Sequence, residues 1–122
     1  MSTRGRELGS WAEHEVCAYL RASGYEILET NFRCREGEID VVARDGSSLV
    51  FVEVKARTGT GYGVPADAVD LKKRQRLARC ALRYLIDRKA SAQEVRFDVA
   101  SVLARPGRAP SIRILRGAFD GF

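Results

Sequence analysis

Two acidic side chains and one basic side chain lie inside segments that otherwise have the composition of core β-strands. Asp40 lies within Glu38–Ala43, and Glu53 and Lys55 lie within Leu49–Lys55; both segments are rich in β-branched residues. An unpaired charge buried in such a strand costs several kcal/mol. We therefore expect the three charged groups to have partners, and their positions point to chemistry rather than to packing.

Hairpin geometry predicts where these side chains point. The dipeptide Asp45-Gly46 is a strong hairpin-turn signal between the two strands. A two-residue turn places Asp40 opposite Phe51, and a four-residue loop places it opposite Glu53. Because side chains alternate between the two faces of a strand, both registers put Asp40, Glu53 and Lys55 on one face of the sheet.

Two like charges on one face repel, so a cation must hold them together. Carboxylate oxygens are ligands that suit Mg²⁺ or Mn²⁺. The alternative is a surface salt-bridge cluster, in which Lys55 and nearby arginines neutralise the acids. The Glu-x-Lys pattern is weak alone, since Glu94-Val95-Arg96 has nearly the same form with no chemistry suggested.

Periodicity elsewhere predicts an α/β fold with a mixed sheet. The 122 residues suit a single domain, residues 1–122. Apolar residues at helical spacing predict two helices, and β-branched segments predict five strands. The expected elements are a helix over Arg6–Ala22, a strand over Tyr25–Arg33, the two strands above, a glycine-rich loop over Thr58–Gly63, a helix over Ala66–Arg88, a strand over Val95–Leu103, a turn over Pro106–Pro110 and a strand over Ser111–Leu115.

Composition narrows the classes of partner. A net charge of +5 favours polyanions such as DNA, although basic residues also keep proteins soluble. No apolar run approaches the roughly 20 residues that span a bilayer, and we expect a cytoplasmic protein with no membrane partner. His14 and Cys17 lack a second ligand pair, so zinc is not expected, and the three cysteines predict free thiols rather than disulfides.

Two motifs resemble a known family. Gly37-Glu38-Ile39-Asp40 and Phe51-Val52-Glu53-Val54-Lys55 resemble the YraN-like family of small bacterial proteins, in the PD-(D/E)xK nuclease superfamily. This resemblance implies a restriction-endonuclease-like αβββαβ core whose central mixed sheet is flanked by helices. It extends over nearly the whole chain, through Leu8-Gly9, Glu13, Tyr19-Leu20, Gly24-Tyr25, Asn31, Tyr62-Gly63, Ala68-Val69, Lys73 and Arg96-Phe97-Asp98.

The resemblance also implies roles for individual residues. Asp40 and Glu53, with the backbone carbonyl of Val54, would bind Mg²⁺ or Mn²⁺. Lys55 would orient the attacking water and help to deprotonate it, and the metal would stabilise charge on the scissile phosphate. Glu13 matches an additional acid of the superfamily, which contacts the metal directly or through water.

The first helix offers two acids for this last role. The periodicity alone places Glu15 near the middle of the apolar stripe and Glu13 towards its edge. The resemblance ranks Glu13 first and leaves Glu15 as the alternative. The family more usually has glycine where this chain has Ala12. Glu38 is either a carboxylate behind the metal ligands or an ordinary acid at a strand end.

Basic side chains of the second helix are candidates for binding DNA. They form a stripe at steps of four, three and four residues, which is either a phosphate-contacting surface or a solvated face. Lys73 lies towards the core edge and matches a lysine of the family, so it is the best candidate to reach the site or a phosphate. The nucleic-acid-binding candidates are Lys73, Arg57, Tyr62, Lys72, Arg76, Arg79 and Arg83.

The combined expectation is an Mg²⁺- or Mn²⁺-dependent DNA endonuclease. Its core resembles that of Holliday-junction resolvases, so branched DNA is the suggested substrate, and this step is an analogy between folds. The main alternative is a DNA-binding accessory protein of repair, recombination or uptake whose nuclease-like site is idle. A third, DNA-independent scaffold role fits the intact acidic set less well. A homodimer is compatible with this class, although no residue demonstrates it.

Overall fold

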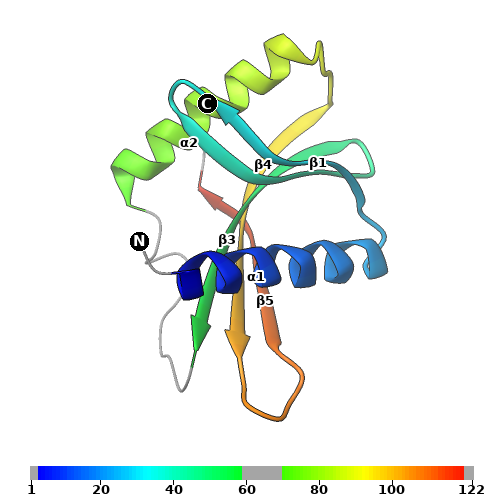
Figure 1. Cartoon of the computed structure of the whole chain (residues 1–122). Coiled ribbons are helices and arrows are strands. Elements are labelled where there is room, and N and C mark those ends of the chain that lie inside the picture. Colours follow the sequence, from blue (N-terminus) through cyan, green and yellow to red (C-terminus); the bar gives the residue numbers. More distant parts are fainter. Residues whose placement is uncertain (1–2, 59–69, 120–122) are drawn as a thin grey trace.

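The computed structural model describes residues 3–58 and 70–119 and contains two helices and five strands in this part of the chain. The strands form one sheet in the order β1-β2-β3-β4-β5, with β3 and β4 parallel and the other neighbours antiparallel. This confirms the predicted mixed sheet and αβββαβ order. The elements, shown in Figure 1, are α1 (Thr3–Ala22), β1 (Glu26–Cys34), β2 (Gly37–Asp45), β3 (Ser48–Thr58), α2 (Leu71–Asp87), β4 (Glu94–Ala104) and β5 (Ser111–Phe119).

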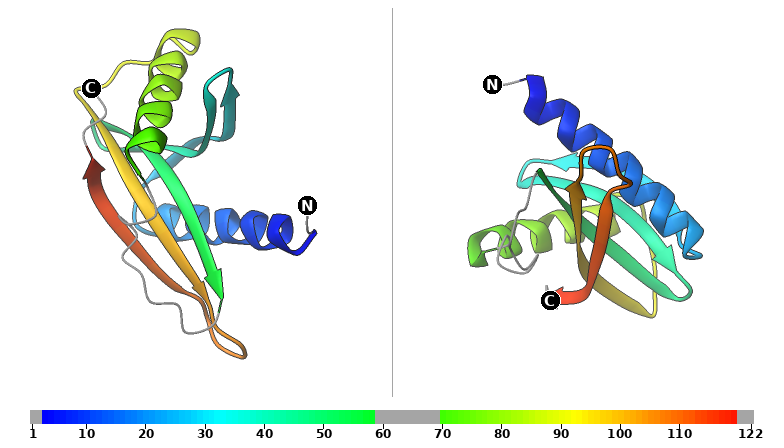
Figure 2. Two further views of the ribbon diagram at one scale, coloured as in Figure 1. Left: turned by 90° about the vertical axis from the view of Figure 1, so that its left-hand side faces the viewer. Right: turned by 90° about the horizontal axis from the view of Figure 1, so that it is seen from below.

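The two helices cover opposite faces of the sheet. Leu49 and Phe51 of β3 pack in one apolar cluster with α2, whereas Val50 and Val52 pack in another with α1. This division follows from the alternation of side chains along a strand, because alternate residues of β3 face different helices. Two views at right angles show α1 and α2 on different sides of the sheet (Figure 2).

The stripe predicted for α1 is largely buried. Ala12, Val16 and Leu20 are fully or almost fully buried, and Trp11 is partly buried at the edge of their cluster. Tyr19 of the same helix is 43% exposed. In the described part of the chain, no helix has the length and apolar character needed to cross a membrane.

The β2–β3 hairpin has the second of the two predicted registers, with a turn shifted by one residue. Asp45 pairs with Ser48, so the turn is formed by Gly46 and Ser47 rather than by Asp45 and Gly46. Gly46 has φ +61°, a left-handed conformation that glycine adopts at little cost. Val41 pairs with Val52, and continuing this register places Asp40 opposite Glu53.

The second helix begins later than predicted. Asp70, which the prediction placed inside the helix, has an extended backbone (ψ 175°), and its side chain accepts a hydrogen bond from the Lys73 N–H. The short carboxylate of aspartate favours this cap over a helix interior. Residues 59–69, which include Tyr62 and most of the predicted loop, lie outside the described residues.

A buried polar group joins β4 to β5. Asp98 is 1% exposed, and its Oδ1 accepts hydrogen bonds from Arg96 Nε at 2.9 Å and from the Gly117 N–H at 2.9 Å. Arg96 also donates to the Tyr25 hydroxyl at 2.9 Å. Asp98 is therefore part of a structural ion pair with Arg96, and β5 continues to Phe119 rather than ending at Leu115.

The sheet divides where β2 leaves β3. The β2–β3 ladder starts at Val41 and Val52, whereas residues 37–39 of β2 pair only with β1. Beyond Val52, β3 continues as the parallel partner of β4 as far as Thr58. We call this division, between residues 37–40 and residues 53–58, the fork. In Figure 1 the start of β2 lies beside α2 while β3 runs away from it.

Candidate metal centre

At the fork, Asp40 accepts a hydrogen bond from a backbone N–H that has no partner in the β2–β3 ladder. Val54 lies just beyond the last pair of the β2–β3 ladder, so the ladder does not supply an acceptor for its N–H. Asp40 Oδ2 accepts this hydrogen bond at 2.8 Å. The division of the sheet therefore fixes the first candidate ligand, because a backbone N–H inside a protein needs a partner.

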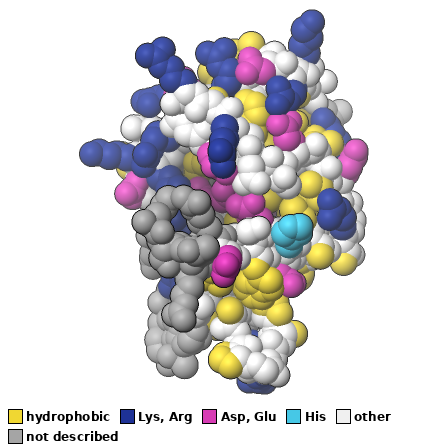
Figure 3. All heavy atoms as spheres, in the orientation of Figure 1, with side chains coloured by type: hydrophobic (Ala, Val, Ile, Leu, Met, Phe, Trp, Pro, Cys, Tyr) yellow, Lys and Arg dark blue, Asp and Glu magenta, His cyan; other side chains and the backbone are white. Residues whose placement is uncertain are grey.

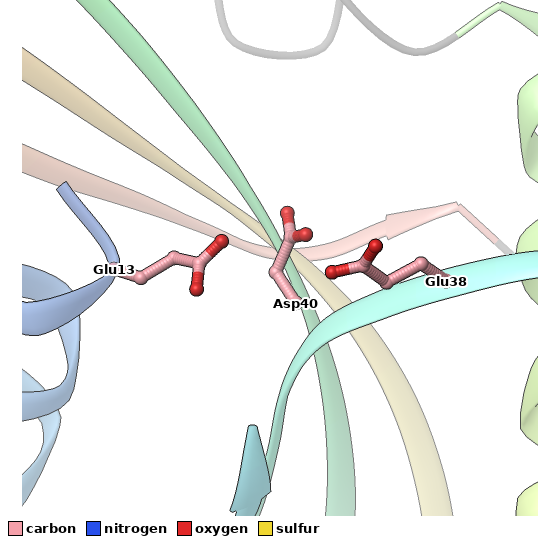
Figure 4. Close-up of side chains that lie close together, drawn as sticks. All are labelled: Glu13, Glu38 and Asp40. Atoms are coloured by element: carbon pink, nitrogen blue, oxygen red, sulfur yellow. The ribbon is translucent and has the colours of Figure 1, made fainter. Parts of the chain in front are cut away.

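Three carboxylates meet at the fork. Glu13 of α1 and Glu38 and Asp40 of β2 each offer one oxygen, and these oxygens all lie within 4.8 Å of one another. Figure 4 shows the three side chains extending towards a common point from the helix and from the strand. All three are partly exposed, so an ion from solvent has access to them.

One amide bridges two of these acids. The Asn31 side-chain nitrogen donates to Glu13 Oε1 at 2.9 Å and to Glu38 Oε1 at 2.8 Å. The other oxygen of Glu38 lies 3.4 Å from Arg33 Nε in an exposed ion pair. These contacts connect α1, β1 and β2 around Asp40.

The second predicted acid lies on the α2 side of the fork. Glu53 is 8% exposed, and its Oε2 lies 3.4 Å from the ammonium of Lys73. Lys55 follows on the same face of β3, and its ammonium interacts with Lys73, Glu53 and Asp40. The sequence predicts that Lys73 lies towards the edge of the core. In the structure its ammonium lies at this site, beside Glu53.

Asp40 and Glu53 line one pocket of about 320 Å³ between the β1–β2 end and α2. Cys80 of α2 lines this pocket, its Sγ lies 2.8 Å from Cys34 Sγ of β1, and both are free thiols. Figure 3 shows acidic side chains at the centre of this face with Lys and Arg around them. The complete lining in the described residues is Glu36, Gly37, Glu38, Asp40, Glu53, Lys73, Arg76, Leu77 and Cys80.

Crowding among the acids changes the proton affinity of Asp40. Burial, and then the hydrogen bond and negative charge of Glu53, raise the pKa of Asp40 to about 8, although the Val54 N–H opposes this. Glu13 adds a smaller rise. Burial and the neighbouring carboxylates together therefore favour the protonated form of Asp40 when no metal ion is bound.

The two lysines respond in opposite directions. Burial, followed by the adjacent ammonium of Lys73, lowers the pKa of Lys55. Burial also acts to lower the pKa of Lys73, but the charge of Glu53 and hydrogen bonds to Lys55 and Glu53 outweigh it, so this pKa is raised. Lys73 is the cation that stays charged beside Glu53, and Lys55 is the amine that gives up its proton more readily.

The donor set fits a hard divalent cation. Carboxylate oxygens on a site open to solvent are what Mg²⁺ and Mn²⁺ require, since these ions keep water ligands and take few protein ones. The raised pKa of Asp40 supports the same conclusion, because a divalent charge at this point would compensate the repulsion among the acids. The acidic cluster is thus able to hold a metal ion.

The structure separates the other predicted site residues. Glu13, not Glu15, reaches the acidic cluster found among the described residues, because α1 crosses the sheet with its stripe edge over the fork. Arg76 lines the pocket, whereas Lys72, Arg79 and Arg83 are exposed along α2. Arg57 is partly buried near the end of β3, outside the pocket lining of the described residues.

Two residues, Glu38 and Asn31, have larger roles at this site than their sequence positions predict. Glu38 joins the cluster, and its position two residues before Asp40 on a strand was a usable signal, because such residues share a face. In the sequence, Asn31 is distinguished only by the family resemblance. Its bridging role depends on a contact between three elements, which no spacing along the chain reveals.

Comparison with known proteins identifies the family. The model of the uncharacterised protein family UPF0102 matches residues 12–102. A UPF0102 protein of Nocardia farcinica is 47% identical over 112 residues, covering 92% of this chain and 88% of the relative. One from Frankia casuarinae is 48% identical over 113 residues, covering 92% and 95%, and one from Moorella thermoacetica is 42% identical over 120 residues, covering 98% and 100%. The chain therefore belongs to the UPF0102 family, the YraN-like family that its motifs indicate.

Proposed function

We propose that this protein is a divalent-metal-dependent DNA endonuclease that hydrolyses phosphodiester bonds at the fork. The observation that carries the proposal is the convergence of acids from two faces of the sheet. Glu13 reaches the fork from α1, and Asp40 shares a pocket with Glu53, with Lys55 next to it. A surface salt-bridge cluster would not be expected to raise the pKa of Asp40 to about 8.

Asp40, Glu53 and Glu13 would hold the ion, with the Val54 carbonyl as a further oxygen donor. Bound there, Mg²⁺ or Mn²⁺ supplies Lewis acidity and makes a water more acidic. Lys55 would orient the attacking water and accept its proton, for which a lowered pKa is the required property. The Asp40–Val54 hydrogen bond keeps one carboxylate oxygen at a fixed place beside β3.

Lys73 and the basic face of α2 would bind the DNA backbone. The ammonium of Lys73, which lies 3.4 Å from Glu53 at the pocket, would contact a phosphate there. The exposed side chains of Lys72, Arg76, Arg79 and Arg83 continue this positive surface along one helix. Branched DNA is the preferred substrate in this proposal, and a homodimer is the expected form because paired sites suit four-way junctions.

One contact favours a second candidate, a DNA-binding accessory protein with an idle site. Lys73 already neutralises Glu53 at 3.4 Å, as expected of a site that functions without metal. The two candidates differ in what the acids do to DNA. In a nuclease they are needed for cleavage, whereas in a binding module they only repel phosphate, and removing them improves retention of DNA.

The test is cleavage of plasmid, single-stranded and four-way DNA with Mg²⁺ or Mn²⁺. Asp40→Ala and Glu53→Ala should abolish cleavage, whereas Glu15→Gln, which removes an acid of α1 outside the acidic cluster, should leave it intact. Cleavage that persists in both pocket variants belongs to a contaminant and removes the assignment. Tighter DNA binding by both variants, without cleavage by the wild type, supports the accessory role.

A further inference from the structure

Asn31 is the neutral side chain that joins the acids of the fork. Its amide donates to Glu13 Oε1 at 2.9 Å and to Glu38 Oε1 at 2.8 Å. We propose that Asn31 is a positioning residue that assembles the metal centre by holding Glu13 and Glu38 beside Asp40. This inference rests on the proposed metal-dependent function and adds to it the residue that holds Glu13, one of the proposed ligands, and Glu38 beside Asp40.

The backbone of Asn31 suits this role. Its φ of +54° is left-handed, a conformation that asparagine adopts far more readily than most residues other than glycine. Asn31 lies between the pairs Thr30–Val41 and Phe32–Ile39, directly across from Asp40. The residue of β1 with a positive φ is therefore opposite the acid at the fork, and its side chain contacts Glu38 of the strand and Glu13 of the helix.

The chemistry of the amide suits it as well. One NH₂ group supplies two hydrogens, and each is used on a different carboxylate. A lysine or arginine here would neutralise the acids and compete with a metal ion, and an aspartate would add to their repulsion. A neutral donor lowers the cost of bringing two anions together while their charge stays available to a cation.

The bridge also leaves donor atoms for the ion. It uses only one oxygen of Glu13, so the second oxygen remains able to bind metal. The Arg33 pair on the other oxygen of Glu38 is highly exposed, with the Arg33 side chain 78% accessible, so solvent screens it.

Substitutions at position 31 distinguish the effect of the side-chain amide from the effect of the backbone conformation. Asn31→Gly keeps the left-handed conformation at little cost and removes the bridge, whereas Asn31→Ala loses both. We expect Asn31→Gly to raise the Mn²⁺ dissociation constant about 10–100-fold, the usual effect of removing a group that orients metal ligands. Asn31→Asp should weaken binding through lost donors, although the added carboxylate increases the local negative charge.

The measurement is Mn²⁺ binding by electron paramagnetic resonance and calorimetry, well below the Tm of each variant. Thr30→Ala, an exposed neighbour on β1, is the matched control and should bind as the wild type. Asp40→Asn and Glu13→Gln test whether the carboxylates of the metal centre are needed to bind Mn²⁺. A purely structural Asn31 would lower Tm without changing the Mn²⁺ affinity of the folded protein.

The outcomes distinguish the inference from the function on which it rests. If Asn31→Gly binds Mn²⁺ like the wild type while Asp40→Asn and Glu13→Gln do not, the centre exists but Asn31 does not organise it. If the wild type itself shows no site for Mn²⁺, the proposed function fails and the positioning role fails with it. Weakened binding in Asn31→Gly and Asn31→Ala, with Thr30→Ala unchanged, supports the inference.

Discussion

Replacing Asp40 by asparagine should stabilise the protein when metal is removed. In the fold, burial and the adjacent Glu53 raise the pKa of Asp40 from 3.8 to about 8. Between these two pH values the folded chain keeps a proton that the unfolded chain has lost, so stability falls as pH rises. Asparagine removes the charge and keeps an oxygen that accepts the Val54 hydrogen bond.

The magnitude follows from the same linkage. Each pH unit between the unfolded and folded pKa corresponds to about 1.4 kcal/mol, which gives an upper limit of about 4 kcal/mol at pH 7. Asp40 is partly exposed, and solvent screening reduces this limit to about 1–3 kcal/mol. The advantage of Asp40→Asn should shrink to about 0.5 kcal/mol at pH 4, close to the unfolded pKa of 3.8, because the unfolded chain regains the proton there.

Urea unfolding in chelator at pH 4, 5.5 and 7 measures this dependence, with Glu15→Gln as the control for loss of one negative charge. Adding Mg²⁺ should reverse part of the difference. An ion at ten times its dissociation constant stabilises the wild type by about 1.4 kcal/mol and the variant much less. An Asp40→Asn protein that is less stable than the wild type at pH 7 in chelator would refute the electrostatic reasoning.

Three further predictions follow from other contacts. Asp98→Asn breaks a buried charge pair with Arg96 and should lower the free energy of unfolding by about 3 kcal/mol, measured by urea denaturation. Asp70→Ala removes the N-cap of α2 and should cost about 1 kcal/mol in the same assay, with Asp70→Ser retaining most of the stability. The double variant Arg76→Ala/Arg79→Ala should weaken DNA binding and make it less dependent on salt, by fluorescence anisotropy across a salt series; an unchanged salt dependence would remove α2 from the interface.

The core of the site could be predicted because it depends on local periodicity. The hairpin signal and the alternation of side chains placed Asp40 and Glu53 on one face in either register, and both line the same pocket. The spacing of Lys73 on its helix likewise indicated the core edge, where its ammonium meets Glu53. These conclusions required only the regular spacing of side chains along each helix and each strand.

The rest of the site depends on how the elements are arranged in space. The periodicity of α1 favoured Glu15, but the angle at which the helix crosses the sheet brings Glu13 to the fork. The start of α2 was placed too early because Asp70 competes for the backbone as a cap. Where β2 leaves β3 is also not visible in the strand pattern, since both segments keep their β-type composition beyond the division.

The division of the sheet explains why an unfavourable charge arrangement persists here. A regular β2–β3 ladder would satisfy the Val54 N–H with a backbone carbonyl, and Asp40 would have no hydrogen bond at that position. The left-handed Asn31 lies across from Asp40, where β2 has left β3. A fold selected for stability alone would gain by closing this gap and replacing its acids with apolar residues. The protein instead uses Asn31 and the Val54 N–H to hold carboxylates in place, and these carboxylates become favourable together when a cation binds among them.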